Sequence, residues 1–134
     1  MTQQQFPKHE RLHENKAITT LFEQGNSFFI YPFKVFVREN KNAEKPTLRL
    51  LISISKKRFK RAVLRNRIKR LTREGWRQNK HTLLSVCTVK ESTIDVALIY
   101  TATQLHSFKE IQKKITVILR QITEQYEISE KNTD

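Results

Sequence analysis

Residues 61–74, RAVLRNRIKRLTRE, combine a dense run of positive charge with apolar residues at helical spacing. Leu64, Ile68 and Leu71 recur at intervals of four and three residues, which predicts one face of an α-helix. On a helical wheel Gly75 extends this narrow stripe, which is wide enough to lie on a β-sheet. The opposite side of the helix carries Asn66, Lys69, Arg70, Arg73 and Arg77. The segment therefore predicts a helix that packs on a sheet with one side and presents cations with the other.

Positive charge is concentrated around this helix. Residues 55–80 contain twelve Lys or Arg residues and one acidic residue, Glu74, so the segment holds +11 of the chain's net charge of +13. Solvated helix surfaces usually mix charges of both signs, and an unbalanced charge repels itself unless a polyanion or salt screens it. The pattern predicts a nucleic-acid partner first and an anionic membrane surface second. For Glu74 we expect a helix-surface ion pair with Arg70 or Arg67 rather than a catalytic role.

Three other segments have the pattern of β-strands, namely residues 27–38, 47–55 and 93–102. Each is rich in β-branched or aromatic residues. Pro32 predicts an edge or a break in the first of them, and the apolar run 93–102 is predicted to be a central strand. The polar segment 39–46 is predicted to be a hairpin connection.

Two further helices are predicted near the ends of the chain. The first begins at Asn15, which can cap it, and stops near Gly25. The last begins with the capping-box pattern of Ser107 and Glu110. Its apolar stripe is Phe108, Ile111, Ile115, Ile118, Leu119 and Ile122. Residues 79–92 are predicted to be a polar connection that extends the basic helix at its start.

This order of elements predicts an α/β (α+β) two-layer sandwich, in which helices pack on a four-stranded mixed sheet in the order αβββαβα. A strand–helix–strand unit spans residues 47–102, with the basic helix as its crossover. The 134 residues suit one domain. We expect about residues 10–127 to be ordered, and residues 1–9 and 128–134 to be mobile tails.

The sequence offers no recognisable catalytic centre. One cysteine, Cys87, permits no intramolecular disulfide or cysteine-rich metal site, and the four histidines lack metal-ligand spacing. No glycine-rich phosphate loop, signal peptide or membrane-spanning run is present. These features predict a soluble, cytoplasmic domain that binds RNA or DNA, has no metal site and performs no chemistry of its own.

Two surfaces are candidates for nucleic-acid binding. The first is the basic helix with the loop before it, where guanidinium groups and an exposed helix N-terminus suit phosphate. Its candidate residues are Lys56, Lys57, Arg58, Lys60, Arg61, Arg65, Asn66, Arg67, Lys69, Arg70, Arg73 and Arg77. Asn66 either donates to phosphate or ribose, or bonds to a neighbouring loop. The second surface is the non-core face of the sheet, where Phe36 either stacks on bases or is covered by the first helix.

The motif Arg65-Asn66-Arg67-x-Lys69-Arg70-x-x-Arg73-Glu74, preceded by Ala62-Val63, closely resembles the signature helix of the bacterial ribonuclease P protein component. Arg11-Leu12 and the strand that ends Ser53-x-Ser55-Lys56-Lys57 fall in the order of that family, and the resemblance covers roughly residues 10–125. One departure is the loop RFKR at residues 58–61, which has no glycine and one apparent extra residue where many family members have a glycine-containing loop.

The resemblance implies an accessory protein subunit of the endoribonuclease that removes the 5′ leader of precursor tRNA. The catalytic RNA and its Mg²⁺ ions would perform the hydrolysis, the protein alone would bind no cofactor, and it would be monomeric outside the ribonucleoprotein. The signature helix would face the catalytic RNA, and the crossover through it would be left-handed, against the usual rule. A cleft between the sheet and the first helix would receive the leader, with candidates Phe22, Phe33, Lys34, Phe36, Arg38 and Lys56.

Two other functions fit parts of the sequence. A structural RNA-binding protein, such as a ribosomal subunit component, would carry the same charge. A helix that lies on a membrane surface would need many large apolar residues opposite its charges. This helix offers Leu64, Ile68, Leu71 and Trp76, which the sheet already requires.

Overall fold

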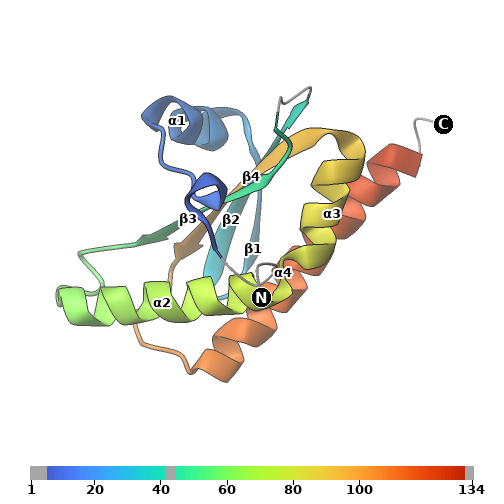
Figure 1. Cartoon of the computed structure of the whole chain (residues 1–134). Coiled ribbons are helices and arrows are strands. Elements are labelled where there is room, and N and C mark those ends of the chain that lie inside the picture. The colour runs from blue at the N-terminus through green and yellow to red at the C-terminus, as the bar shows by residue number, and fades with distance from the viewer. Residues whose placement is uncertain (1–5, 42–44, 132–134) are drawn as a thin grey trace.

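The computed structural model describes residues 6–41 and 45–131 and places four strands in one mixed sheet (Figure 1). The strands are β1 (Asn26–Ile30), β2 (Phe33–Lys41), β3 (Leu48–Ile54) and β4 (Ser92–Tyr100). Their spatial order is β1-β2-β4-β3. β4 is antiparallel to β2 and parallel to β3. The predicted four-stranded mixed sheet is therefore confirmed.

The centre of the sheet is β4, as its apolar sequence predicts. Eight of its nine residues are buried, and Ile99 is the half-buried exception. A strand covered on both faces reads as a continuous apolar run. Because β4 lies between β2 and β3, residues 39–46 do not form the predicted hairpin connection. The chain instead crosses from one side of β4 to the other.

Pro32 does break the first predicted strand. β1 and β2 form a hairpin in which Ile30 is paired with Phe33, and the Tyr31–Pro32 peptide bond between them is cis. In β2 the side chains of Phe33, Val35 and Val37 are buried, as their alternation predicts.

The helices are α1 (Asn15–Gln24), α2 (Ala62–Asn79), α3 (His81–Lys90) and α4 (Phe108–Lys131). Glu14, not Asn15, is the N-cap residue of α1, and its side chain makes no capping bond. The sequence did not predict α3 as a helix of its own. Its apolar side chains occur on all sides rather than as one stripe, so helical periodicity gives no signal.

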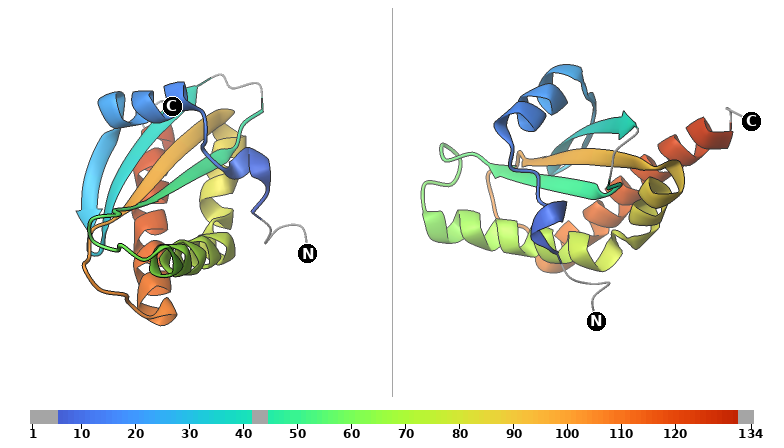
Figure 2. Two further views of the ribbon diagram at one scale, coloured as in Figure 1. Left: turned by 90° about the vertical axis from the view of Figure 1, so that its left-hand side faces the viewer. Right: turned by 45° about the horizontal axis from the view of Figure 1, so that its top comes forward.

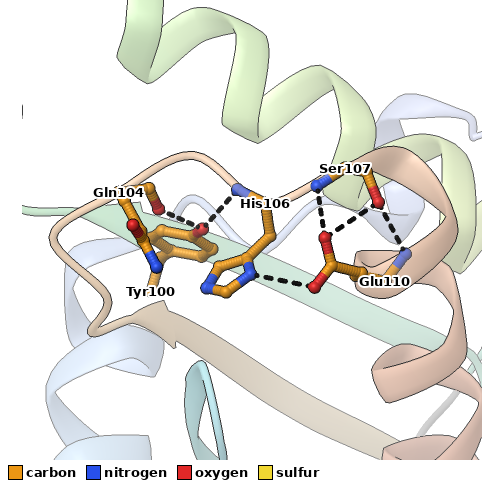
Figure 3. A network of polar contacts seen from close by, with 5 residues as sticks. All are labelled: Tyr100, Gln104, His106, Ser107 and Glu110. Atoms are coloured by element: carbon orange, nitrogen blue, oxygen red, sulfur yellow. Dashed lines mark hydrogen bonds and ion pairs between the residues drawn. The ribbon is translucent and has the colours of Figure 1, made fainter.

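At the start of α4 the predicted capping box is present (Figure 3). The backbone N–H of Glu110 donates to Ser107 Oγ over 3.2 Å, and the backbone N–H of Ser107 donates to Glu110 Oε1 over 3.2 Å. The reciprocal bonds satisfy donors that the helix end leaves without partners.

Helices cover both faces of the sheet to different extents (Figure 2). The main core lies between one face and α2, α3 and α4, which confirms the two-layer sandwich. On the other face α1 covers only part of the sheet, over a small core of Leu12, Leu21 and Ala97. α2 and α3 connect the parallel neighbours β3 and β4, as the strand–helix–strand prediction requires, and the hand of this crossover stays a prediction.

The structure describes parts of both predicted tails, and the mobility of these tails stays a prediction. Residues 6–12 pack on the domain through the short 3-10 helix η2 (Lys8–Glu10), and the buried Glu10 forms an ion pair with the buried Lys80. Each charge offsets part of the cost of burying the other. At the other end α4 continues to Lys131, past the predicted boundary at residue 127. Residues 1–5 and 132–134 of the predicted tails lie outside the described residues.

Candidate nucleic-acid interface

The inner side of α2 packs between β3 and α4. Ile68 and Trp76 are fully buried, as are Thr72 and Gly75, whereas Leu64 and Leu71 are half-buried. The buried stripe is therefore rotated from the prediction toward Thr72 and Trp76. α4 lies against the other flank of the helix, where Gln112 Nε2 donates to Gln78 Oε1 at 2.7 Å. A Cβ on Gly75 would lie 3.0 Å from Ile115 Cδ1, so the absent side chain permits the close approach of α4.

The outer side of α2 presents Asn66, Arg67 and Arg70 to solvent. Within residues 6–41 and 45–131, none of these three side chains makes a hydrogen bond or ion pair, so their polar groups face solvent. This disfavours the interpretation that Asn66 bonds to a neighbouring loop. Lys69 and Arg73 flank the surface and are half-buried. We call Asn66, Arg67 and Arg70 the outer face of α2.

Two other arginines of α2 already have partners within the protein. Arg65 Nη1 donates to the carbonyl oxygens of Phe59 at 2.6 Å and Lys60 at 3.0 Å. Arg77 Nε donates to Glu74 Oε2 at 3.1 Å, and this bond holds the pKa of the Glu74 carboxyl below its ordinary value. The predicted ion pair of Glu74 is real, but its partner is Arg77 rather than Arg70 or Arg67.

The loop before α2, residues 55–61, keeps its shape without glycine. Phe59 is only 5% exposed, and its ring lies 5.9 Å from the ring of Tyr100. Its backbone N–H donates to the Ser55 carbonyl at 3.1 Å, and Arg58 donates to the carbonyl of Thr101. This anchoring leaves Lys56, Lys57, Lys60 and Arg61 exposed beside the N-terminus of α2. The sequence pattern did not predict that Phe59 anchors the loop. The available clue was one aromatic residue inside the basic run KKRFKR.

The open face of the sheet gathers aromatic residues beside α1. Phe36 is half-buried beneath Phe22 of α1, with ring centroids 4.9 Å apart in an edge-on arrangement. Lys34 Nζ lies 5.3 Å from the centre of the Phe36 ring. Phe36 is thus partly covered by the first helix, as one of the two interpretations held, and Phe22 itself is 37% exposed.

Two predicted cleft residues lie apart from this group. Phe33 is fully buried on the opposite face of the sheet, within the core beneath α2 and α4, because successive side chains of a strand point to opposite faces. It cannot line a cleft with Phe22. Arg38 is half-buried and is paired across the sheet with Asp95.

Two exposed aromatic residues extend the open face and were not predicted. Phe29 is 57% exposed and neighbours Lys34 across the hairpin, and Tyr31 is 49% exposed. Tyr31 also lies edge-on to His106, with 5.7 Å between ring centroids, and His106 belongs to the polar network shown in Figure 3. Alternation along residues 27–38 alone would place Phe29 with Phe33, and only the hairpin between β1 and β2 brings it to the face of Lys34. We define the open aromatic surface as Phe22, Phe29, Tyr31, Lys34 and Phe36.

Reactive groups are not gathered at either surface. Among the described residues no group of three or more His, Cys, Asp or Glu side chains could hold a metal ion. Burial raises the pKa of the Cys87 thiol to about 12, so little thiolate forms near neutral pH. In the same part of the chain no helix has the length and apolar character needed to cross a bilayer.

Comparison with known proteins agrees with this geometry. The family described as Ribonuclease P matches residues 6–123. The ribonuclease P protein component of Porphyromonas gingivalis is 37% identical over 106 residues, which are 79% of this chain and 77% of that protein. The RNase P protein of Staphylococcus aureus superposes with a TM-score of 0.63 at 30% identity, over 83% of this chain and 93% of that one. The RNase P protein of Thermotoga maritima gives a TM-score of 0.67 at 25% identity, over 84% and 96%. The chain belongs to the ribonuclease P protein family.

Proposed function

We propose that this chain acts in ribonuclease P by binding the catalytic RNA with the outer face of α2 and the loop at residues 55–61. As a member of the family it is the accessory protein subunit of the RNA-based endoribonuclease that matures the 5′ end of tRNA. The observation that carries the proposal is the outer face itself, where Arg67 and Arg70 are exposed on a helix held rigidly by its buried side. Arginine forks of this kind form paired bonds with phosphate oxygens.

The open aromatic surface is the proposed site for the single-stranded 5′ leader of precursor tRNA. Unpaired bases stack on exposed aromatic rings with little sequence preference, and nearby cations attract the backbone. Phe22, Phe29 and Tyr31 offer such rings, and Lys34 lies among them. Lys56, in the exposed loop after β3, is a further candidate for the leader backbone.

Catalysis in this proposal belongs to the RNA. Mg²⁺ bound by the RNA subunit would supply the chemistry of the hydrolysis, while the protein supplies binding and orientation. The free protein is proposed to be a cytoplasmic monomer, because self-repulsion of its net charge of +13 opposes self-association.

The test is reconstitution with a cognate catalytic RNA and a precursor tRNA at low Mg²⁺. The protein should stimulate 5′ cleavage, and Arg67→Ala/Arg70→Ala should reduce the stimulation. Lys113→Ala/Arg120→Ala, which removes two exposed charges from α4, is the matched control. No stimulation by a folded protein would contradict the proposal, and co-sedimentation with ribosomes would then favour a structural RNA-binding role.

A further inference from the structure

A second basic surface is formed by residues that are scattered in the sequence. It is a groove of about 910 Å³ beside the N-terminal end of β3, and its described lining includes no residue of α2 or of the loop at residues 55–61. Its charged Lys, Arg and Glu residues are Lys8, Arg11, Lys45, Arg49 and Glu14. Outside residues 55–80 the sequence is almost neutral. The fold nevertheless places four cations and one carboxylate around this one groove.

The guanidinium group of Arg49 is held by bonds within the protein, so its charge is not available to a ligand. Its Nε and Nη2 atoms donate to the two carboxylate oxygens of Asp95 at 2.7 and 3.0 Å, and Nη1 donates to Glu14 at 3.2 Å. These bonds raise the pKa of Arg49, chiefly through Asp95, and two carboxylates offset its charge. The surplus positive charge comes from the exposed Lys8, Arg11 and Lys45, which form no ion pair with the described residues.

The wall that carries Lys8 and Arg11 is held in place by three contacts. Leu12 N–H donates to the Leu50 carbonyl at 2.9 Å at the edge of the sheet, and the Leu12 side chain is buried under α1. The buried ion pair of Glu10 with Lys80 anchors η2. The cations are therefore arranged before a ligand arrives, which lowers the entropy lost on binding.

We propose that this groove binds phosphate groups, supplied either by the backbone of an RNA strand or by a free nucleotide. An excess of Lys and Arg around a fixed concave surface attracts phosphate by charge and by charge-assisted hydrogen bonds. The groove lies on the same face of the sheet as the open aromatic surface. Arg49 is level with Asp95 and Arg38 across the strands, and Phe36 stands two residues before Arg38 on β2, so its side chain points to the same face. The groove is separate from the outer face of α2. An experiment can therefore contradict phosphate binding at one of these two surfaces without contradicting it at the other.

The experiment uses the full chain with Lys8→Ala/Lys45→Ala and two probes, a short single-stranded oligoribonucleotide and ATP. Binding is measured by fluorescence anisotropy and by calorimetry at several salt concentrations. The variant should bind at least one probe several-fold more weakly than the wild type. Weaker binding of the oligoribonucleotide, with a salt slope smaller by about 1.4 because two phosphates are no longer neutralised, assigns the RNA backbone. Weaker binding of ATP alone assigns a free nucleotide.

Lys113→Ala/Arg120→Ala removes the same charge from α4 and is the control. Equal affinities of the groove variant, the control variant and the wild type for both probes would overturn the proposal. An equal reduction of affinity in both variants would also overturn it, because net charge alone would then explain the binding. The urea midpoint of each variant verifies its fold. Arg67→Ala/Arg70→Ala, measured in parallel, reports separately on the outer face of α2.

Discussion

The two sides of α2 use the same short segment for opposite purposes. On the inner side Ile68, Gly75 and Trp76 are buried against β3 and α4. On the outer side Arg67 and Arg70 have no partner among the described residues. Arginines near the boundary, such as Arg65, bind carbonyls of the protein itself. These residues share the same side chain. The position of each arginine relative to the buried stripe therefore decides whether it supports the fold or is available to RNA.

The inner side should give the largest effect on stability. Ile68→Ala removes a fully buried side chain between the helix and the sheet, which should lower the free energy of unfolding by about 2–5 kcal/mol. The measurement is urea unfolding followed by circular dichroism. Val63→Ala on the same helix is the control, because Val63 is 76% exposed and its change should stay within about 0.5 kcal/mol. Equal effects of the two variants would contradict the assigned faces.

Leu64→Asp should be less damaging than Ile68→Asp. The sequence treats Leu64 and Ile68 as equal members of one stripe, but Leu64 is half-buried and Ile68 is fully buried. A carboxylate at position 64 can reach water, whereas one at position 68 would be buried without a partner. Expression and unfolding of the two variants give the comparison, and a more stable Ile68→Asp protein would refute it.

A smaller effect is expected where α2 meets α4. In Gly75→Val the added side chain would meet Ile115 Cδ1, which lies 3.0 Å from an ideal Cβ, and the backbone of Gln112. Overpacking of this kind should destabilise the protein by about 1–3 kcal/mol. An unfolding midpoint equal to that of the wild type would show that α4 does not approach α2 as closely as described.

Arg65→Ala tests the boundary between the two sides. Removal of its bonds to the carbonyls of Phe59 and Lys60 should lower the free energy of unfolding by about 1 kcal/mol. RNA binding should fall less than in Arg67→Ala, because part of the Arg65 fork is already engaged. Arg65→Lys keeps the charge and loses the fork, so it separates the two contributions. If Arg65→Ala unfolded with the same free energy as the wild type, the bonds of Arg65 to the loop would not support the fold, and Arg65 would belong to the outer face of α2.

The start of α4 gives a further modest effect that depends on pH. Ser107→Ala removes the hydroxyl that accepts from the Glu110 N–H, which should destabilise the protein by about 1 kcal/mol. Bonds from Ser107, first its backbone N–H, hold the pKa of the Glu110 carboxyl below its ordinary value. This contribution to stability is present above the ordinary carboxyl pKa and is lost as the pH falls through the lowered one. Glu110→Gln should therefore flatten that part of the pH profile of stability, and an unchanged profile would contradict the assignment.

The sequence predicted the parts of the fold whose signal is local and periodic. The strands around Val35 and Val96, the break at Pro32 and the cap at Ser107 follow from neighbouring residues alone. The apolar run of β4 also predicted its central place, but not that β2 and β3 lie on either side of it, because that pairing joins segments distant in the chain. α3 was not predicted because its apolar residues, although some are buried in the core, do not line up along one side of the helix.

The candidate sites divide in the same way. The helical wheel found the outer face of α2, since Asn66, Arg67 and Arg70 need only their own spacing. It could not assign Arg65 to the Phe59 carbonyl, because that bond depends on the path of the loop before the helix. Phe33 was misplaced because the family resemblance named it as a cleft candidate, although the alternation of its strand already placed it with Val35 and Val37 on the core face. The groove around Arg49 joins segments distant in the chain, so no local pattern contains it.

The outer face should contribute least to stability and most to RNA binding, and this contrast is measured directly by the salt dependence of affinity for the catalytic RNA. Arg67→Ala/Arg70→Ala should unfold within about 0.5 kcal/mol of the wild type. Its plot of log affinity against log salt should be less steep by about one unit for each phosphate that the variant no longer neutralises. A folded double variant with the slope and affinity of the wild type would show that the outer face of α2 does not bind RNA phosphates.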